Sequence, residues 1–333
     1  MPDSSLWFLI FIVALAIGFG VVNGFNDAAN AVAAAIGSRA LSPRKAIIIA
    51  VIANMAGAAT GLAVAKTIGK GILTPEAISY LTVMAALASV IIWGSVATYL
   101  GLPVSISHSF ISALAAAGMA VTGGGAVAWG VLGRVLMAVV TAPVLGFIGG
   151  FVLMLILFWV CCRIAPSRMR VVFSRLQWLT TAFLAYSHGK NDGQMPIGVI
   201  TMALVIYTGQ SGLWEHIPWW VIVVSGLAIS LGTAVGGWRV IKTVGVRVTA
   251  LQPVHGFAVQ VSAATVIEIA SLFGIPVSTT HCVSSAVMGV GATRRLSAVR
   301  WGVAGNIVAA WILTFPICGV LGYLFAWLMK VIF

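Results

Sequence analysis

Three carboxylates of this chain lie inside apolar segments, where an ionisable group is costly to bury. On insertion scales, a charged side chain at the centre of a membrane helix costs at least about 2.5 to 3.5 kcal/mol. Carboxylate and amide oxygens are hard ligands that suit small cations. We therefore predict a cation-binding or coupling role for Asp27, Asn30, Asp192 and Glu268. The candidate Na⁺ ligands are Asn26, Asp27, Asn30, Asn191 and Asp192.

A second set of polar residues suits an anion. Residues 101–108 read Gly-Leu-Pro-Val-Ser-Ile-Ser-His, and residues 274–281 read Gly-Ile-Pro-Val-Ser-Thr-Thr-His. Proline is tolerated at a helix start, and serine or threonine caps the first turn. Such a start presents N–H groups and the positive dipole end to an anion, although capping without ligand contact is the alternative. The candidate anion ligands are Ser105, Ser107, Ser278, Thr279 and Thr280, with the amides of Asn26, Asn191 and Gln194.

These motifs occur twice in the same order. The segment 101–108 returns 173 residues later, and Thr141-Ala142-Pro143 returns as Thr314-Phe315-Pro316 at the same offset. Upstream, Gly24-Phe25-Asn26-Asp27 is echoed by Gly189-Lys190-Asn191-Asp192, and residues 66–69 by residues 242–245. A duplicated unit with polar interruptions is typical of secondary transporters. Glu268 breaks the symmetry because its counterpart is Ser95, so a purely structural carboxylate remains an alternative there.

The composition indicates that the elements carrying these motifs are membrane helices. Apolar residues make up 61% of the chain and charged residues 7%, whereas soluble domains have about a quarter charged residues. Apolar stretches of about 20 residues, long enough to cross a bilayer, recur throughout. The four cysteines have no metal-site spacing. We predict ten membrane segments near residues 6–36, 46–64, 79–100, 104–121, 130–160, 176–206, 218–237, 252–273, 276–292 and 301–329.

The distribution of charge predicts the topology. With the N-terminus outside, 13 of the 18 basic residues fall in inner loops, as the positive-inside rule requires. The net charge of +12 is therefore explained by topology and anionic lipid, without nucleic acid. Five crossings per unit make the units inverted relative to each other. We predict a first repeat unit at residues 1–162, a cytoplasmic basic linker at 163–175 and a second unit at 176–333.

The predicted fold is an all-α polytopic membrane protein with two inverted-topology repeats. The short segments 104–121 and 276–292 carry polar residues in their first turns, so we interpret them as half-helices or re-entrant elements that meet at the midplane. Gly24, Gly189 and Gly193 are expected to permit an unwound backbone whose carbonyls join the cation site.

Several of these motifs resemble those of the inorganic phosphate transporter (PiT) family. Residues 24–31, Gly-Phe-Asn-Asp-Ala-Ala-Asn-Ala, are similar to its Gly-x-Asn-Asp-x-x-Asn motif, and residues 187–194 resemble the second copy. Both Pro-Val-Ser segments and residues 236–245 are also similar to family members. The resemblance implies a cation-coupled phosphate permease of the cell membrane, usually a homodimer, with no cofactor beyond the coupling cation, Na⁺ or H⁺.

The second copy departs from the motif. Met195 stands where the first copy has Asn30, which places a second symmetric cation site in doubt. Lys190 adds a charge that can pair with Asp192, steer an anion or extend to the interface. His108, His188 and His281 are candidate proton relays, with a structural role as the alternative.

The substrate can be argued from its chemistry. Phosphate keeps a P–OH donor at neutral pH and sulfate has none, so an ionised carboxylate near the anion favours phosphate. A sulfate permease of the same family stays an alternative, and so does an anion channel. No catalytic metal motif occurs, and Ser107-His108 and Thr280-His281 are merely sequence neighbours, so we predict that the protein is not an enzyme.

Overall fold

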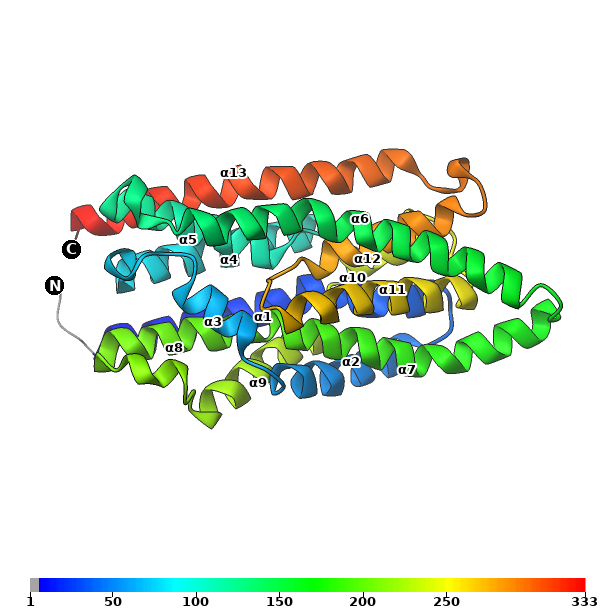
Figure 1. Cartoon of the computed structure of the whole chain (residues 1–333), viewed down its shortest axis with the longest axis horizontal. Helices are drawn as coiled ribbons and strands as arrows, with labels where there is room; N and C mark the ends of the chain where they lie inside the picture. Colours follow the sequence, from blue (N-terminus) through cyan, green and yellow to red (C-terminus); the bar gives the residue numbers. More distant parts are fainter. Residues whose placement is uncertain (1–5, 333) are drawn as a thin grey trace.

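The computed structural model describes residues 6–332, and its long helices lie roughly along one common axis (Figure 1). The first half contains α1 (Leu6–Gly37), α2 (Pro43–Ala58), α3 (Ala63–Lys70), α4 (Tyr80–Leu100), α5 (Ile106–Thr122) and α6 (Trp129–Val160). The second half contains α7 (Pro166–Asp192), α8 (Gln194–Thr208), α9 (Trp219–Val235), α10 (Trp238–Lys242), η4 (Thr243–Arg247), α11 (Pro253–Leu272), α12 (Thr279–Ala292) and α13 (Trp301–Ile332). The all-helical prediction is confirmed.

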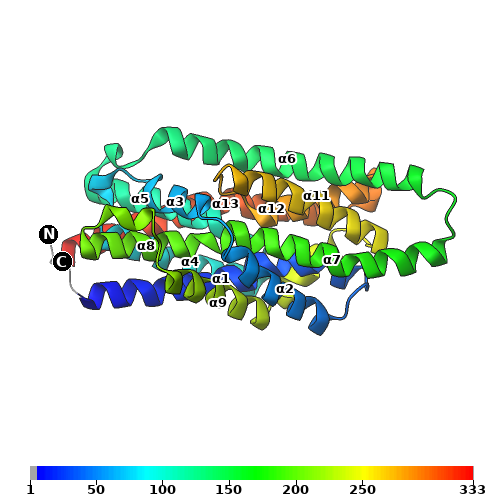
Figure 2. The ribbon, with the colours of Figure 1, turned by 60° about the horizontal axis from the view of Figure 1, so that its bottom comes forward.

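Counterpart helices of the two halves run in opposite directions. Figure 1 shows α6 running away from the end that holds the chain termini, whereas α13 returns towards it. The same holds for α1 and α7, which Figure 2 shows from a second side. This arrangement agrees with the predicted inversion. Residues 166–175 of the predicted linker form the first turns of α7, and the division of the chain into units stays a prediction.

The predicted half-helices α5 and α12 begin near the middle of the molecule and point to opposite ends (Figure 1). Each is held by the long last helix of the other half, since α5 packs on α13 and α12 packs on α6. Ser105 and Ser278 are their N-caps and accept hydrogen bonds from the backbone N–H groups of His108 and His281 at 3.2 and 3.1 Å. The two starts are therefore fixed from both halves.

The expected unwinding at Gly24 and Gly189 is wrong, because both lie inside continuous helices. Their function is close packing. A Cβ on Gly24 would lie 2.2 Å from the carbonyl oxygen of Ile229 in α9, and one on Gly189 would lie 2.2 Å from that of Asn54 in α2. Each glycine thus lets the helix with an Asn-Asp pair cross a helix of the other half. Only Gly193 marks a break, between α7 and α8.

Other helices are broken where the sequence predicted single crossings. The segment predicted at 46–64 is divided between α2 and α3, which meet at 70°, and α9 meets the following turns at 62°. Within residues 6–332, five helices are long and apolar enough to span a membrane, or seven if each bent pair counts as one. The ten-segment layout stays a prediction.

The apolar core is divided into two parts with a polar layer between them. Along α1, residues up to Val22 belong to one core cluster and residues from Ala29 to the other. Along α7 and α8 the same change occurs between Ala185 and Met195. The Asn-Asp pairs fall in both gaps. The sequence therefore places both Asn-Asp pairs between the two main apolar clusters.

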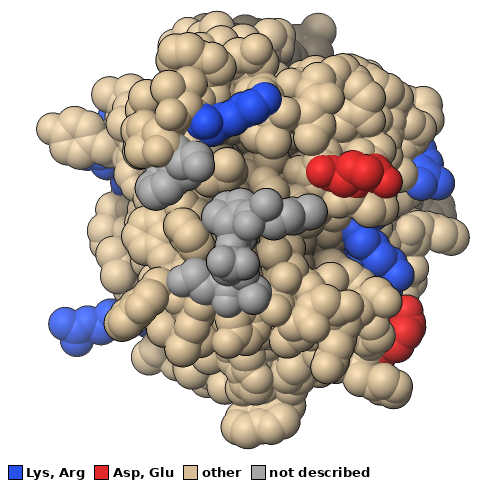
Figure 3. All heavy atoms as spheres, turned by 90° about the vertical axis from the view of Figure 1, so that its left-hand side faces the viewer, with Lys and Arg blue, Asp and Glu red and all other residues tan. Residues whose placement is uncertain are grey.

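The two ends of the molecule differ in charge. Figure 3 looks onto the end with the chain termini, where acidic and basic side chains both appear on a mostly uncharged surface. Glu215 lies beside Lys66 and Lys70, with its carboxylate oxygens 2.8 and 3.8 Å from their ammonium nitrogens. The connections α1–α2, α6–α7, η4–α11 and α12–α13 lie at the opposite end (Figure 1). Most of the arginines belong to these connections or to the helix ends that adjoin them.

Candidate functional site

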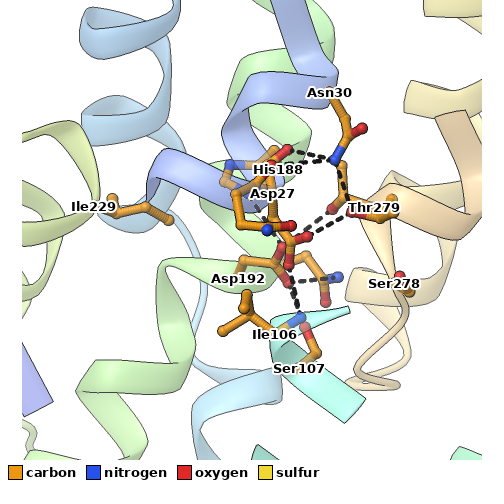
Figure 4. A network of polar contacts seen from close by, with 12 residues as sticks. Asp27, Asn30, Ile106, Ser107, His188, Asp192, Ile229, Ser278 and Thr279 are labelled. Carbon is orange, nitrogen blue, oxygen red and sulfur yellow. Dashed lines mark hydrogen bonds and ion pairs between the residues drawn. The ribbon is translucent and has the colours of Figure 1, made fainter. Parts of the chain in front are cut away.

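The polar layer brings together residues from four helices at the centre of the molecule (Figure 4). Helices α1 and α7 contribute the Asn-Asp pairs, and α5 and α12 contribute their first turns. Every side chain of this cluster is buried, with at most 1% exposed. We call it the central cluster. It consists of Asn26, Asp27, Asn30, Ser105, Ser107, Asn191, Asp192, Ser278, Thr279 and Thr280.

Asp27 accepts hydrogen bonds from both half-helices. The backbone N–H of Ile106 in α5 donates to its Oδ2 at 3.1 Å, and the Thr280 hydroxyl of α12 donates to its Oδ1 at 2.5 Å. Asn30 extends the chain, because its amide donates to the Thr280 hydroxyl at 2.7 Å. An anionic side chain at a helix start is favoured by the helix dipole. The Asp27 carboxylate thus lies at the N-terminus of α5, where an anion is favoured.

Asp192 is bonded in a matching way. The Ser107 hydroxyl of α5 donates to its Oδ1 at 2.8 Å, and the Thr279 hydroxyl of α12 donates to its Oδ2 at 3.2 Å. Ser107 and Thr280 occupy equivalent repeat positions, so each aspartate accepts a hydroxyl from the half-helix of the opposite half. Ile106 and Thr279 are likewise equivalent, but isoleucine has no hydroxyl and uses its backbone amide instead.

The asparagine side chains of the central cluster donate hydrogen bonds through their amide nitrogens, but their amide oxygens are unpaired. Asn26 donates to the Thr98 hydroxyl at 2.6 Å, and Asn191 donates to the Val277 carbonyl at 2.6 Å. The Oδ1 atoms of Asn26, Asn30 and Asn191 are buried and accept no hydrogen bond from any described residue. A buried unpaired acceptor is unfavourable by about 1 to 3 kcal/mol. Beside two carboxylates, these oxygens fit the coordination of a hard cation such as Na⁺.

Two predicted ligands lie outside the central cluster. Gln194 caps α3, where its Oε1 accepts the backbone N–H groups of Val64 and Ala65 at 2.9 and 3.1 Å. Glu268 forms a partly buried ion pair with Lys190, a pairing that is not among the three roles considered for that lysine. The structure therefore brings neither side chain to the carboxylate pair.

Two of the predicted relay histidines, His108 and His281, belong to a group of aromatic rings in contact with one another. The ring centroids of His108 and His281 lie 5.0 Å apart in an edge-on arrangement, and the His281 ring lies 4.0 Å from that of Trp311. Within residues 6–332, neither side chain forms a hydrogen bond to Asp27 or Asp192. This packing agrees with the structural alternative, and a relay role stays a prediction.

His188, in contrast, touches a carboxylate of the site. Its Nε2 lies 3.1 Å from Oδ2 of Asp192, and its Nδ1 lies 2.8 Å from Oδ1 of Asn54. Asn54 donates through Nδ2 to Thr233 at 3.0 Å, so its Oδ1 can only accept and Nδ1 of His188 carries a hydrogen. Nε2 therefore faces the Asp192 carboxylate at close range, although it makes no hydrogen bond within residues 6–332.

Sequence reasoning missed Asn54, Thr98 and Thr233. Asn54 is the only amide in the apolar segment 46–64, and that isolation was a usable signal. Thr98 gave no such signal, because threonine is common in membrane helices and its hydroxyl often bonds to the backbone one turn earlier. Here the Thr98 hydroxyl donates to the Gly94 carbonyl at 2.7 Å.

Comparison with known proteins links this site to a family. The family model described as the phosphate transporter family matches residues 23–322. A probable low-affinity inorganic phosphate transporter of Rhizobium meliloti (strain 1021) is 39% identical over 317 residues, covering 94% of this chain and 95% of that protein. One of the same name from Bacillus subtilis (strain 168) is 37% identical, covering 99% and 100%. A solved structure titled the sodium-dependent phosphate transporter matches with a TM-score of 0.90 and 28% identity, covering 98% and 100%.

The fold and the central cluster define a membrane transport protein of the helical, broken-helix class. The chain belongs to the phosphate transporter family, since the model covers nearly its whole length. This confirms the resemblance seen in the sequence. The relatives are named as transporters, which agrees with the prediction that the protein is not an enzyme.

Proposed function

We propose that this protein takes up inorganic phosphate in symport with a cation, Na⁺ or H⁺, by alternating access. The observation that carries the proposal is the direct bonding between the predicted cation ligands and the predicted anion donors. Ser107 donates to Asp192 and Thr280 donates to Asp27, each across the two halves. Family membership and the sodium-dependent structural neighbour support the same reading.

This bonding gives a physical basis for coupling. A hydroxyl has one proton and cannot donate it to a carboxylate and to phosphate at the same time. A cation at Asp27 or Asp192 competes for the carboxylate oxygens and frees the hydroxyls for the anion. The anion in turn neutralises the cation in a site of low dielectric constant. Each ligand therefore favours binding of the other, as linkage requires.

We assign phosphate recognition to the facing starts of α5 and α12. The first N–H groups of a helix have no intrahelical acceptor, and they lie beside the hydroxyls of Ser107, Thr279 and Thr280. A carboxylate that remains free of cation accepts the P–OH of phosphate but repels sulfate. Sulfate is the alternative substrate if cations occupy both carboxylates.

The decisive experiment is uptake of radiolabelled phosphate into proteoliposomes, with Na⁺ and H⁺ gradients imposed separately and sulfate as competitor. We expect accumulation above equilibrium that requires one of the two gradients and saturates with phosphate. Flux that follows the phosphate gradient alone would indicate a channel. Complete competition by equimolar sulfate would identify the alternative substrate. Ser109→Ala is a matched control, because this buried hydroxyl of α5 donates to the Ser105 carbonyl at 2.7 Å and not to a carboxylate.

The membrane arrangement is part of the proposal. We place the protein in the cell membrane as a homodimer, with the chain termini outside and the arginine-rich end in the cytoplasm, following the positive-inside rule. Cysteines introduced at Arg44, Arg247 and Arg295 should be labelled only from the cytoplasmic side, and one at Glu215 only from outside. Labelling of two or more from the wrong face would refute this orientation.

A further inference from the structure

Two adjoining cavities lie at the arginine-rich end of the molecule. The first, the arginine cavity, has a volume of about 510 Å³ and is lined by Arg39, Arg170 and Arg300. The second, the apolar groove, has a volume of about 280 Å³, with Leu157 and Phe158 in its wall. The two share Arg170, Gln252 and Pro253. A single molecule with a charged end and an apolar end can therefore occupy both.

The charge of the arginine cavity is not balanced by protein. Its three guanidinium groups come from the α1–α2 connection, from α7 and from the residue before α13. None of the described residues that line it is an aspartate or glutamate. The nearest carboxylates along these helices, Asp27 and Asp192, are buried in the central cluster. The Arg300 guanidinium also donates to the Arg247 carbonyl at 3.2 Å. Three arginines around one cavity, with no carboxylate among the lining residues, favour an anion, and guanidinium groups bind phosphate oxygens in pairs.

Arg39 occupies a backbone position that favours glycine. Its φ of 59° makes it the one described non-glycine residue with positive φ. It ends α1 in a Schellman motif, in which Arg39 N–H donates to the Ile36 carbonyl at 3.0 Å and Ala40 N–H to the Ala35 carbonyl at 3.1 Å. Glycine is the usual residue at this position because it has no Cβ. An arginine there is unfavourable for the fold, and this outlier supports a functional role for its side chain.

The apolar groove suits a hydrocarbon chain. It lies between the last turns of α6 and the first turns of α7 and α11, and Val254 completes its wall beside Leu157. Apolar side chains around it remain exposed, with Phe158 at 43% and Ile164 at 44%. In a membrane protein, such a surface faces lipid.

We propose that the arginine cavity and the apolar groove together bind one anionic phospholipid. The lipid phosphate contacts Arg39, Arg170 and Arg300, and one acyl chain follows Leu157 and Val254. Basic pockets between membrane helices on the cytoplasmic side are suited to such headgroups. The site lies at the end of the molecule, apart from the central cluster, and does not depend on the transported substrate.

Lipid titration of the purified full-length protein in detergent, followed by native mass spectrometry, tests this assignment. We expect phosphatidylglycerol to bind at least about tenfold more tightly than phosphatidylcholine. Arg39→Gly should weaken phosphatidylglycerol about fivefold, the effect of about 1 kcal/mol per basic residue near the headgroups. The melting temperature of this variant should not fall, because glycine suits the positive φ. Arg175→Gln, which removes an exposed charge of α7 outside both cavities, is the matched control and should change affinity less than twofold.

Two further arms distinguish the source of the anion. Leu157→Trp fills the groove without changing charge, and we expect it to weaken phosphatidylglycerol as Arg39→Gly does. Millimolar inorganic phosphate should not displace the lipid. Equal binding of the two lipids, or an Arg175→Gln effect as large as that of Arg39→Gly, would overturn the proposal. Displacement by inorganic phosphate, with no effect of Leu157→Trp, would instead identify a free-phosphate site.

Discussion

The two halves of the central cluster place an aspartate in equivalent positions but surround it differently. Asp27 has Asn30 one turn away, with an unpaired amide oxygen, and Asn23 on its other side. Asp192 has Met195 in place of Asn30 and His188 in place of Asn23, and His188 lies 3.1 Å from the carboxylate. The first half therefore offers more oxygen ligands, and the second places a histidine ring against its carboxylate.

The two sequence repeats therefore share the framework of the site but not its charge chemistry. Both aspartates accept the equivalent hydroxyls, Ser107 and Thr280, of the opposite half-helix. The neighbours that would complete a cation shell are kept only around Asp27. We therefore expect the first half to respond to the concentration of the coupling cation and the second to contribute mainly to anion binding and to the fold of the site.

The largest effect should follow from removing either carboxylate. Asp27→Asn and Asp192→Asn should each lower coupled phosphate uptake by more than about 100-fold, because losing one partner of a buried charged network costs about 3 to 5 kcal/mol. Uptake into proteoliposomes at several cation concentrations measures this. Residual uptake should shift with cation concentration more for Asp27→Asn than for Asp192→Asn.

Folding must be measured in parallel. Both variants should elute as the wild type does in size-exclusion chromatography and insert into liposomes to the same extent. Wild-type uptake by both would refute a functional role for these carboxylates. Equal shifts in cation dependence would remove the difference between the halves.

The next largest effect concerns the hydroxyls that cross between the halves. Ser107→Ala and Thr280→Val should each weaken phosphate binding about 10- to 150-fold, the value of one hydrogen bond to a charged group of about 1.5 to 3 kcal/mol. The double variant should lose more than either single variant, since both half-helices close on one anion. Phosphate titration by calorimetry measures this, with Ser109→Ala as control. Unchanged affinity in all three variants would show that these hydroxyls serve the carboxylates alone.

Asn30 and Met195 occupy equivalent positions beside the two aspartates, and exchanging them tests whether they cause the difference between the halves. Asn30→Met should raise the apparent dissociation constant of the coupling cation about tenfold, because one amide oxygen ligand is lost. Met195→Asn should tighten it, by up to a similar factor, if the second half then forms the missing shell. Phosphate uptake measured at increasing cation concentrations would detect both changes. A weaker effect of Asn30→Met than of a control such as Ser109→Ala would place the cation elsewhere.

The sequence predicted the class, the helical architecture and the membership of the central cluster, because the repeat displays Asn-Asp and Pro-Val-Ser motifs in equivalent places. It did not predict that cation ligands and anion donors bond to each other, since this depends on how α5 and α12 meet α1 and α7. Gly24 was misread because a glycine in a polar motif looks the same in sequence whether it unwinds a helix or admits a neighbour. Gln194 was misplaced because a capping amide and a ligand amide are chemically identical.

The smallest effects on phosphate uptake should come from substitutions in two lysine–glutamate pairs. One of these pairs occurs in the second half alone. Lys190–Glu268 belongs to the second half, and its counterparts Phe25 and Ser95 carry no charge. Its side chains are 12% and 21% exposed, so Glu268→Gln leaves a lysine charge partly buried. We expect uptake to fall about threefold to tenfold, with recovery when Lys190→Met is added. Failure of the second substitution to restore uptake would mean that Glu268 itself takes part in transport.

The exposed pair Lys66–Glu215 provides the reference. The hydrogen bond from Lys66 lowers the pKa of Glu215 below its ordinary value. A lowered carboxyl pKa stabilises the folded protein above the unfolded-state pKa, and this contribution is lost as the pH falls through the folded-state pKa. Because the Glu215 side chain is 63% exposed, the contribution is screened by solvent, and Glu215→Gln should change uptake less than about twofold at neutral pH. Melting temperatures of this variant and the wild type should differ little at pH 7 and converge below about pH 4. A loss of uptake comparable to that of Glu268→Gln would show that burial does not account for the difference between the two pairs. The contact between α3 and the α8–α9 connection would then have to change during transport.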